Sequence, residues 1–345
     1  MDVQKILSEA AALVGPSGQE MQVAEYFAEQ FRPFVDEVTV DAMFNVIAHK
    51  KGTGPKVMLC AHMDEIGLMV TRIEEDGSIR LGNVGGVDPR ILPACQVWVH
   101  GREKLFGTIG AMPPHLLSAE DRKKNYERED LYVDVGLPGE KVKELVRVGD
   151  LVTFNAQAIP LLGGQFASKT MDDRACVTIL LCAAERLSRM ACDADVYFVG
   201  STQEEVGSRG AKTASFAIDP DLAVALDVDH ATIPGSRPDT TVALDCLNAS
   251  IGPFIQPKLL QRLLDCAKAH HVKLQTSVSP RYTSTDADEV SESRAGIPTV
   301  LLSLPLKYMH TTVETIDLAA LEEGGRVIAH FLSELDAGWE DDLWI

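Results

Sequence analysis

Strand-like and helix-like segments alternate in two separated parts of this 345-residue chain. The two parts are residues 1–65 and 167–345. Between them, residues 66–166 form short strand-like segments divided by Gly and Pro turns, with a helical pattern only at 119–128. Alternating strands and helices favour a mostly parallel sheet that is covered by helices on both faces. We therefore expect a mixed, mostly parallel α/β domain that is interrupted by a separate β-rich domain.

The elements of the α/β part follow from hydrophobic periodicity. Helices repeat apolar residues every three to four positions, and buried strands are short continuous apolar runs. The Gly15-Pro16-Ser17-Gly18 break separates the first two helices. The predicted helices are 2–14, 19–32, 172–190, 256–270 and 317–335. The predicted strands are 37–41, 44–49, 57–60, 194–201, 221–228, 272–278 and 298–304.

The composition limits the partners that this chain can have. Its 32 basic and 51 acidic residues give a formal charge of −19, which opposes binding to nucleic acid or to anionic membranes. No stretch approaches the roughly 18 apolar residues of a membrane span, and no basic leader precedes an apolar run at the N-terminus. The seven cysteines lack paired metal-site spacing. We therefore expect reduced thiols and a cytoplasmic protein.

A histidine and an aspartate follow the first buried strand. His62 ends that strand, and on an extended chain Asp64, two residues later, points the same way. A metal-binding histidine usually donates its second ring nitrogen to a carboxylate or a carbonyl, and Asp64 can fill that role. The alternative is a simple hydrogen bond between the two side chains at a strand end.

Carboxylates also lie at two further element ends. Asp172 opens a predicted helix, a position where acids are ordinary capping residues. Glu204 and Glu205 follow the strand 194–201, and nearby glycines permit a close turn. A general base must reach a water molecule, and a neighbouring carboxylate can hold the cation that activates this water. A solvated turn explains the glutamate pair equally well.

The last candidates are Asp227, which closes one strand, and His310, which follows the final predicted strand. Because parallel strands end at one edge of a sheet, all these side chains should converge there. Histidines and carboxylates without paired cysteines suit zinc, cobalt or manganese. Five such ligands with one shared carboxylate are the right inventory for two metal ions roughly 3.5–4 Å apart.

The chain resembles the dinuclear aminopeptidase family that includes glutamyl and deblocking aminopeptidases and the tetrahedral, TET-type particles, some of them labelled cellulases. The resemblance implies a zinc-peptidase type α/β domain that carries an inserted, β-barrel-like dimerisation domain. The motifs lie in family order over nearly the whole chain. They are AHMDEIGLMV at 61–70, NVGGVDPRIL at 83–92, MPPHLL at 112–117, VGDLVTF at 148–154, MDDR at 171–174, QEEVGSRGA at 203–211, ALDVDHATIPG at 225–235 and HTTVETID at 310–317.

The resemblance also implies a cofactor and its ligands. Two divalent metal ions are expected per subunit, zinc or cobalt first and manganese as the other choice. His62 and Asp227 would bind one ion. Glu205 and His310 would bind the other, and Asp172 would bridge the two.

The same resemblance implies catalytic roles and partners. Glu204 would be the general base and acid, and Asp64 would orient His62. The substrates would be peptides that lose N-terminal residues, and dimers would build hollow dodecamers.

The chain departs from the family pattern where the substrate pocket is expected. A Gly-rich stretch should precede Thr-Asp-Ala, but residues 283–287 read Thr-Ser-Thr-Asp-Ala. Thr311-Thr312 replaces the expected Ser-Pro after the last histidine. Neither departure removes a proposed ligand. We expect Arg281, Thr285 and Asp286 to contact the substrate.

Three other functions are compatible with parts of the pattern. A dinuclear hydrolase of the carboxypeptidase or aminoacylase type usually carries its dimerisation insert after the paired glutamates, whereas the β-rich stretch here precedes them. A glycosidase needs only two carboxylates and would leave the histidines idle. A non-catalytic assembly protein would be expected to lack a ligand or the base.

Overall fold

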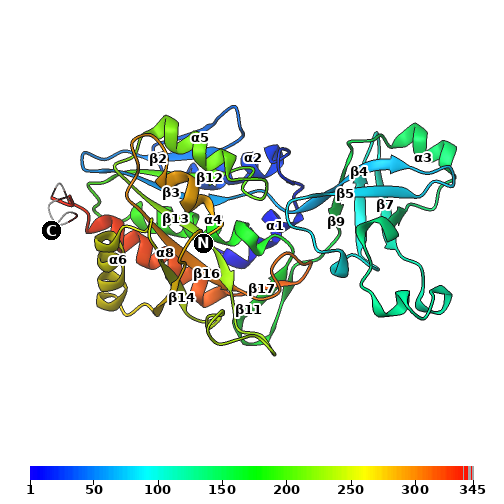
Figure 1. Ribbon diagram of the computed structural model, residues 1–345. Coiled ribbons are helices and arrows are strands. Elements are labelled where there is room, and N and C mark those ends of the chain that lie inside the picture. The colour runs from blue at the N-terminus through cyan, green and yellow to red at the C-terminus, as the bar shows by residue number, and fades with distance from the viewer. Residues whose placement is uncertain (337, 341–342, 344–345) are drawn as a thin grey trace.

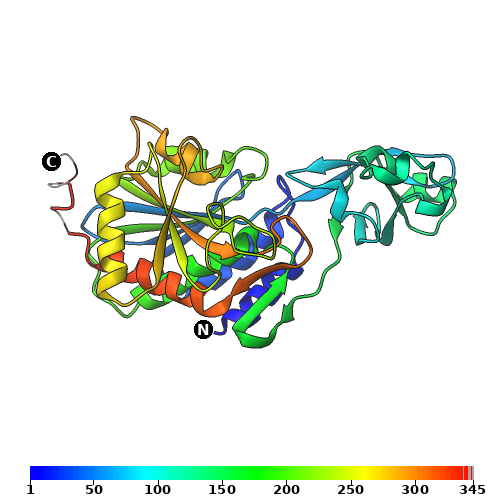
Figure 2. The same ribbon diagram turned by 60° about the horizontal axis from the view of Figure 1, so that its bottom comes forward.

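The computed structural model describes residues 1–336, 338–340 and 343. It contains an eight-stranded mixed sheet packed between helices and a closed six-stranded barrel. In Figures 1 and 2 the barrel stands beside the sheet, and separate segments of chain lead into and out of it. The predicted fold class, a mostly parallel mixed sheet covered by helices with an inserted β-barrel, is confirmed.

The strands of the large sheet lie in the order β1-β2-β12-β3-β13-β16-β14-β15. The central strands β12, β3, β13 and β16 are parallel neighbours, as are β14 and β15, and the other pairs are antiparallel. Ser201 pairs with His62 in this register, so the central strands end at one edge. The bounds are β1 Glu37–Val40, β2 Val46–Lys50, β3 Lys56–His62, β12 Asp195–Ser201, β13 Leu222–His230, β14 Leu247–Ile251, β15 Leu274–Val278 and β16 Thr299–Leu306.

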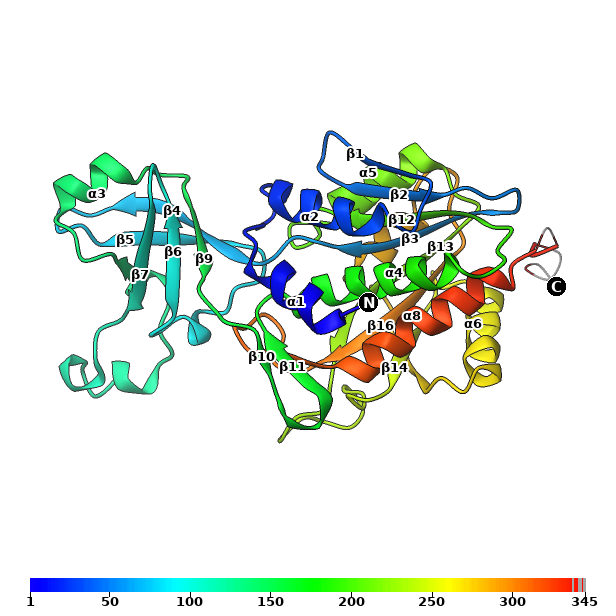
Figure 3. The same ribbon diagram turned by 180° about the vertical axis from the view of Figure 1, so that it is seen from behind.

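Helices cover both faces of this sheet. Figure 3 views the face on which α4 and α8 lie, and α4 is buried along almost its whole length because it packs against β3 on one side and α8 on the other. α5 and α7 pack on the opposite face. The helices are α1 Val3–Ala12, α2 Met21–Phe31, α4 Met171–Leu187, α5 Arg209–Ile218, α6 Pro257–Ala269, α7 Asp286–Ser291 and α8 Leu318–Ser333. Among the described residues, no helix is both long and apolar enough to cross a membrane.

The barrel has its own hydrophobic core. Its closed strand order is β4-β5-β8-β7-β6-β9, and inward side chains such as Leu68, Val97 and Val152 are fully buried. The elements are β4 Gly67–Ile73, β5 Ile79–Val84, β6 Gln96–His100, β7 Lys104–Gly110, β8 Tyr132–Asp134, α3 Gly139–Leu145 and β9 Leu151–Phe154. A separate core of this kind shows that the insert packs as a unit beside the α/β part.

The prediction of a helix at 119–128 is wrong. The segment contains only short 3-10 turns at Asp121–Lys123 and Arg128–Asp130. Almost all of its side chains are exposed, so no apolar stripe packs against the barrel to stabilise an α-helix.

Several elements escaped the sequence prediction. α5, α7 and β14 were not expected, and a small second sheet joins β10 Ile159–Pro160, β11 Gln165–Ser168 and β17 Glu314–Asp317. Asp317, the expected first residue of the helix 317–335, instead ends β17. Its side chain caps α8 by accepting the N–H of Ala320. This small sheet holds the segments that lead into Asp172 and away from His310.

Candidate metal centre

The carboxyl edge of the central strands gathers the predicted site residues. His62 is the last residue of β3, Glu204 and Glu205 follow β12, and Asp227 lies near the end of β13. Because these strands are parallel neighbours, their ends open onto one cavity of about 650 Å³. The cavity lining includes His62, Asp172, Glu204, Glu205, Asp227 and His310.

Asp172 lies between the two histidines. Its Oδ1 is 3.0 Å from Nε2 of His62, and its Oδ2 is 3.3 Å from Nε2 of His310. The same His310 nitrogen is 3.2 Å from Oε1 of Glu205. The start of α4 aims the carboxylate, since Asp172 has a non-helical backbone (φ −79°, ψ 103°). The Asp172–Asp173 peptide bond is cis.

Each histidine is held through its second ring nitrogen. Nδ1 of His62 is 3.2 Å from the carbonyl oxygen of Asp64, and Nδ1 of His310 is 2.9 Å from the carbonyl oxygen of Gly86. Such contacts fix the tautomer and direct the other nitrogen outward as a ligand. Gly86 follows β5 of the barrel, so the insert contributes to this site. A side chain at Gly86 would meet the His310 ring at 2.9 Å.

Asp64 joins the first strand end to the glutamate pair. Its carboxylate accepts the N–H groups of Glu204 at 3.0 Å and Glu205 at 3.2 Å, and the hydroxyl of Ser17 at 2.6 Å. Its Oδ1 is also 3.4 Å from Nδ1 of His62. Although burial opposes it, the contact with His62 lowers the pKa of Asp64, so the carboxylate stays charged. One buried side chain therefore positions both glutamates and the histidine.

The donor atoms are close enough together to hold cations. His62, Asp172 and Glu205 each offer one ligand atom, and these atoms lie within 4.8 Å of one another. The same is true of His62, Asp173 and Asp227. Imidazole and carboxylate donors without thiolates suit zinc, cobalt or manganese. The residues at this edge therefore fit a divalent metal centre.

The acids of the centre repel one another. Burial and the neighbouring Asp173 raise the pKa of Asp227 well above its ordinary value. Burial also raises the pKa of Glu204 to about 8; Glu205 adds to this rise and His62 opposes it. A divalent cation would stabilise the ionised forms and relieve this repulsion.

The pKa of Asp172, which lies between the two histidines, shifts in the opposite direction to those of Asp227 and Glu204. Burial opposes ionisation of Asp172, but the hydrogen bonds with His310 and His62 outweigh it and lower the pKa of this carboxyl. Burial also opposes the charged form of His310 and by itself would lower its pKa. The contacts with Asp172 and Glu205 outweigh this effect and raise the pKa of His310 to about 11. The two histidines thus keep the Asp172 carboxylate ionised.

Two buried acids beside the centre were missed by sequence reasoning. Asp173 accepts the N–H of His62 at 3.2 Å, and Glu314 accepts the N–H groups of Asp172 at 3.1 Å and His310 at 2.9 Å. The only sequence signal for Asp173 was its place beside Asp172. Glu314 lies within a motif that was quoted, but its role depends on the contact between β11 and β17.

Glu20 is a third missed acid. It is fully buried between the first two helices, and its Oε1 accepts the N–H groups of Gly18 at 2.7 Å and Gln203 at 3.1 Å. Gln203 directly precedes Glu204 and has a left-handed backbone (φ 57°). Burial raises the pKa of Glu20 to about 7. Its other oxygen, Oε2, has no hydrogen-bond partner among the described residues.

The three residues expected to contact substrate lie in different surroundings. Thr285 lines the cavity of the metal centre and caps α7. Asp286 is buried below it, where it accepts a hydrogen bond from Ser201, and burial raises its pKa to about 6. Arg281 instead lines a neighbouring cavity of about 1030 Å³, together with Tyr282.

A family model matches most of the chain. The model of the M42 glutamyl aminopeptidases matches residues 45–327. Among curated proteins, the lysyl aminopeptidase of Pyrococcus furiosus is 38% identical over 93% of this chain and 94% of its own length.

Solved structures show the same fold. The TET aminopeptidase of a marine sediment Thaumarchaeota archaeon has a TM-score of 0.94 at 28% identity, over 99% of this chain and 98% of its own. The TET1 peptidase of Pyrococcus horikoshii, which can assemble into a tetrahedron or a large octahedral shell, has a TM-score of 0.84 at 30% identity, over 97% of this chain and all of its own.

We expect Glu20→Gln to stabilise the protein increasingly as the pH rises. The folded-state pKa of Glu20, about 7, lies above its ordinary value of 4.5. Protonation of Glu20 therefore favours the folded state below pH 4.5, and this contribution is lost as the pH rises through about 7. The glutamine amide stays neutral throughout and keeps an oxygen for Gly18 and Gln203.

The measurement is the melting temperature of both proteins at about pH 5 and about pH 8. The melting temperature of the variant should rise relative to that of the wild type from the lower pH to the higher one. A difference in melting temperature that is the same at both would contradict the assignment of this pKa to Glu20.

Proposed function

The chain belongs to the M42 glutamyl aminopeptidase family, a metallopeptidase family, and is a peptide hydrolase of the aminopeptidase type; we propose that it acts through two divalent metal ions bound at the carboxyl edge of its sheet. The observation that carries this proposal is the position of Asp172, whose oxygens lie 3.0 Å from one histidine and 3.3 Å from the other. One carboxylate that faces two imidazoles is suited to bridge two cations.

The ligands would divide between the two ions. His62 and Asp227 would hold one ion, and Glu205 and His310 the other, with Asp172 shared. This division is supported by the contact of His310 with Glu205 at 3.2 Å and by the closeness of His62 to Asp227. Zinc and cobalt suit these donors, with manganese as the other choice.

Glu204 would carry the proton in the reaction. When bound, the cations would polarise the peptide carbonyl and acidify the attacking water. Glu204 lines the cavity, and its Oε2 is 3.9 Å from Nε2 of His62. It would accept the proton of the attacking water and return it to the leaving amine. The Asp64 carboxylate would hold Glu204 in place, because it accepts the backbone N–H of Glu204 at 3.0 Å.

Glu204→Gln should lower kcat for aminoacyl p-nitroanilides about a hundredfold to ten-thousandfold, because the amide cannot accept the proton of water. Its metal content, measured on the purified protein, should equal that of the wild type. Glu140→Gln, an exposed change on the barrel helix α3, is the matched control and should leave activity unchanged. Wild-type activity in Glu204→Gln would sink the assigned role.

We infer a preference for N-terminal lysine or arginine from the acidic lining of the cavity. Besides the ligands, Asp229, Asp288 and Glu289 contribute carboxylates to it. Glu289 pairs with Lys212 at 2.5 Å, whereas Asp229 has no cationic side-chain partner among the described residues. Asp229 lies two residues beyond Asp227 on β13, so both face the same side. The lysyl specificity of the P. furiosus relative agrees with this inference.

Asp229→Asn should therefore reduce kcat/KM for lysyl p-nitroanilide about tenfold or more, with little change for the leucyl substrate, because only the lysyl ammonium group loses a charge partner. Glu289→Gln is the matched control, since its charge is already paired with Lys212, and its loss should be smaller. Equal losses for both substrates in Asp229→Asn would instead mean damage to the metal centre.

We also propose that the protein forms dimers that build a dodecamer, as the TET1 relative assembles into a tetrahedron. Exposed apolar side chains on the barrel support a contact there. Phe106 is 45%, Met112 50% and Leu116 66% exposed, and apolar side chains that gather on a surface favour a contact between proteins.

The seven cysteines are all free thiols, which agrees with the cytoplasm as location.

Leu116→Asp should lower the molecular mass measured in solution, because a buried charge would destabilise an apolar contact between barrels. Leu116→Met keeps the apolar surface and should leave the mass unchanged. Mass measurement by light scattering on both variants tests this. A wild-type mass for Leu116→Asp would show that this part of the barrel lies outside the contact.

A further inference from the structure

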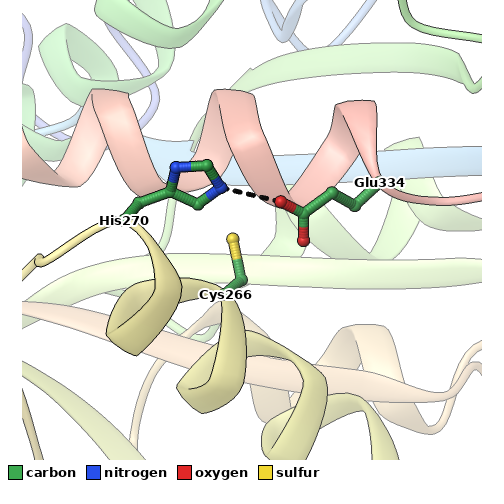
Figure 4. Close-up of side chains that lie close together, drawn as sticks. All are labelled: Cys266, His270 and Glu334. Atoms are coloured by element: carbon green, nitrogen blue, oxygen red, sulfur yellow. Dashed lines mark hydrogen bonds and ion pairs between the residues drawn. The ribbon is translucent and has the colours of Figure 1, made fainter.

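A second cluster of metal-binding side chains lies far from the centre described above. Cys266 and His270 belong to the C-terminal end of α6, and Glu334 caps the C-terminus of α8. Figure 1 places these helices at the end of the α/β part opposite the barrel. Figure 4 shows the three side chains pointing toward one another. The sulfur, one ring nitrogen and one carboxylate oxygen lie within 4.8 Å of one another.

The helices explain why the three side chains meet. Residues four apart on a helix lie on the same face, so Cys266 and His270 are neighbours on α6. α6 packs against α8, and this contact brings Glu334 to them. Nε2 of His270 is 2.8 Å from Oε1 of Glu334.

Stacking holds the His270 ring in this orientation, and a hydrogen bond holds the backbone of the same residue. The ring stacks on the ring of His330 with centroids 3.6 Å apart and an interplanar angle of 11°. The guanidinium of Arg326 donates to the carbonyl oxygen of His270 at 2.6 Å. A ring fixed in this way presents Nε2 to the cluster at little further cost in side-chain entropy.

We propose that Cys266, His270 and Glu334 bind one divalent cation of the zinc or cobalt type. A thiolate, an imidazole and a carboxylate form a donor set that zinc accepts and that magnesium or calcium does not favour. Three protein ligands leave a fourth, open position for water. A cavity of about 350 Å³, lined in part by Cys266 and Glu334, gives access to that position.

The simpler alternative is an ion pair between His270 and Glu334 above an inert thiol. The side chains of these two residues are 28% and 52% exposed, so the pair alone would contribute little to stability. The thiol of Cys266 lies 3.9 Å from the carbonyl oxygen of Val327 and also contacts the carboxylate of Glu334. Burial and the neighbouring Glu334 carboxylate raise the pKa of this thiol to about 12, so cation binding must release its proton.

A bound cation would connect the ends of α6 and α8. Its role would be structural and separate from peptide hydrolysis, because none of its ligands reaches the cavity of the metal centre. Arg262 and Asp265, which carry opposite charges, line the same small cavity. The proposal therefore stands or falls independently of the proposed catalytic residues.

Cobalt titration of the full-length protein tests the site. A thiolate bound to cobalt gives a charge-transfer absorption band in the near ultraviolet, and none of the ligands assigned to the metal centre is a thiol. We expect the wild type to develop this band, with an intensity at saturation that corresponds to one cobalt–thiolate group per chain. Cys266→Ser should lose the band, whereas Cys246→Ser, a half-buried control cysteine, should keep it. A missing band in the wild type, or an unchanged band in Cys266→Ser, overturns the proposal.

The half-buried His270 and the exposed Glu334 provide a second test that does not depend on the folding of the Cys266 variant. His270→Gln and Glu334→Gln should each weaken cobalt binding, followed by the same band, about tenfold or more. Both variants should retain the aminopeptidase activity of the wild type, as should Cys266→Ser. Unchanged cobalt affinity in both variants would show that the thiol binds cobalt without these partners and would overturn the three-ligand site.

Discussion

Burial of negative charge at the carboxyl edge of the sheet is the constraint on which the site depends. An ionised acid in such a place is costly unless it is paired or hydrogen-bonded. The protein meets this demand for Asp64 with backbone N–H groups and a hydroxyl, and for Asp172 with two histidines. For Asp173, Asp227 and Glu314, burial raises the pKa well above the ordinary value. The edge thus has more carboxylates than its own cations can balance, which is the electrostatic condition for binding divalent metal.

The buried carboxylate of Glu65 is balanced by cationic side chains of the protein itself. Glu65 is buried beside Asp64, but it contacts Nζ of Lys169 at 2.6 Å and Nη2 of Arg174 at 3.2 Å, and its pKa is lowered despite burial. The fully buried Arg174 also donates to the carbonyl oxygens of Met63 and Ala10. Removing either cation would leave an unpaired buried charge. This network attaches α1 to the strand end that carries His62, so it fixes the frame against which the metal ligands are positioned.

The sequence contained enough to predict where the strand ends meet, but not what surrounds them. His62 and Asp227 could be placed at one edge because buried apolar runs predict parallel strands, whose carboxyl ends converge. Glu20 and Glu314 could not, because each reaches the site from a distant segment through contacts that exist only in the folded chain. The helix expected at 119–128 failed for a related reason. Its pattern was local, and in the folded chain only Tyr126 of this segment packs against the barrel core.

The loop before α7 shows how this chain replaces the glycines that were expected there. Ser284 adopts a left-handed backbone (φ 57°), which costs a residue with a side chain roughly 1–2 kcal/mol. The carboxylate of Asp288 offsets this cost by accepting the N–H and the hydroxyl of Thr283 and the N–H of Ser284. That carboxylate is therefore committed to the loop. Asp229 accepts only neutral donors, from Asn248 and the backbone of His230. Asp229 thus accepts from two groups and Asp288 from three, so of these two acids we infer that Asp229 is the one that faces a substrate ammonium group.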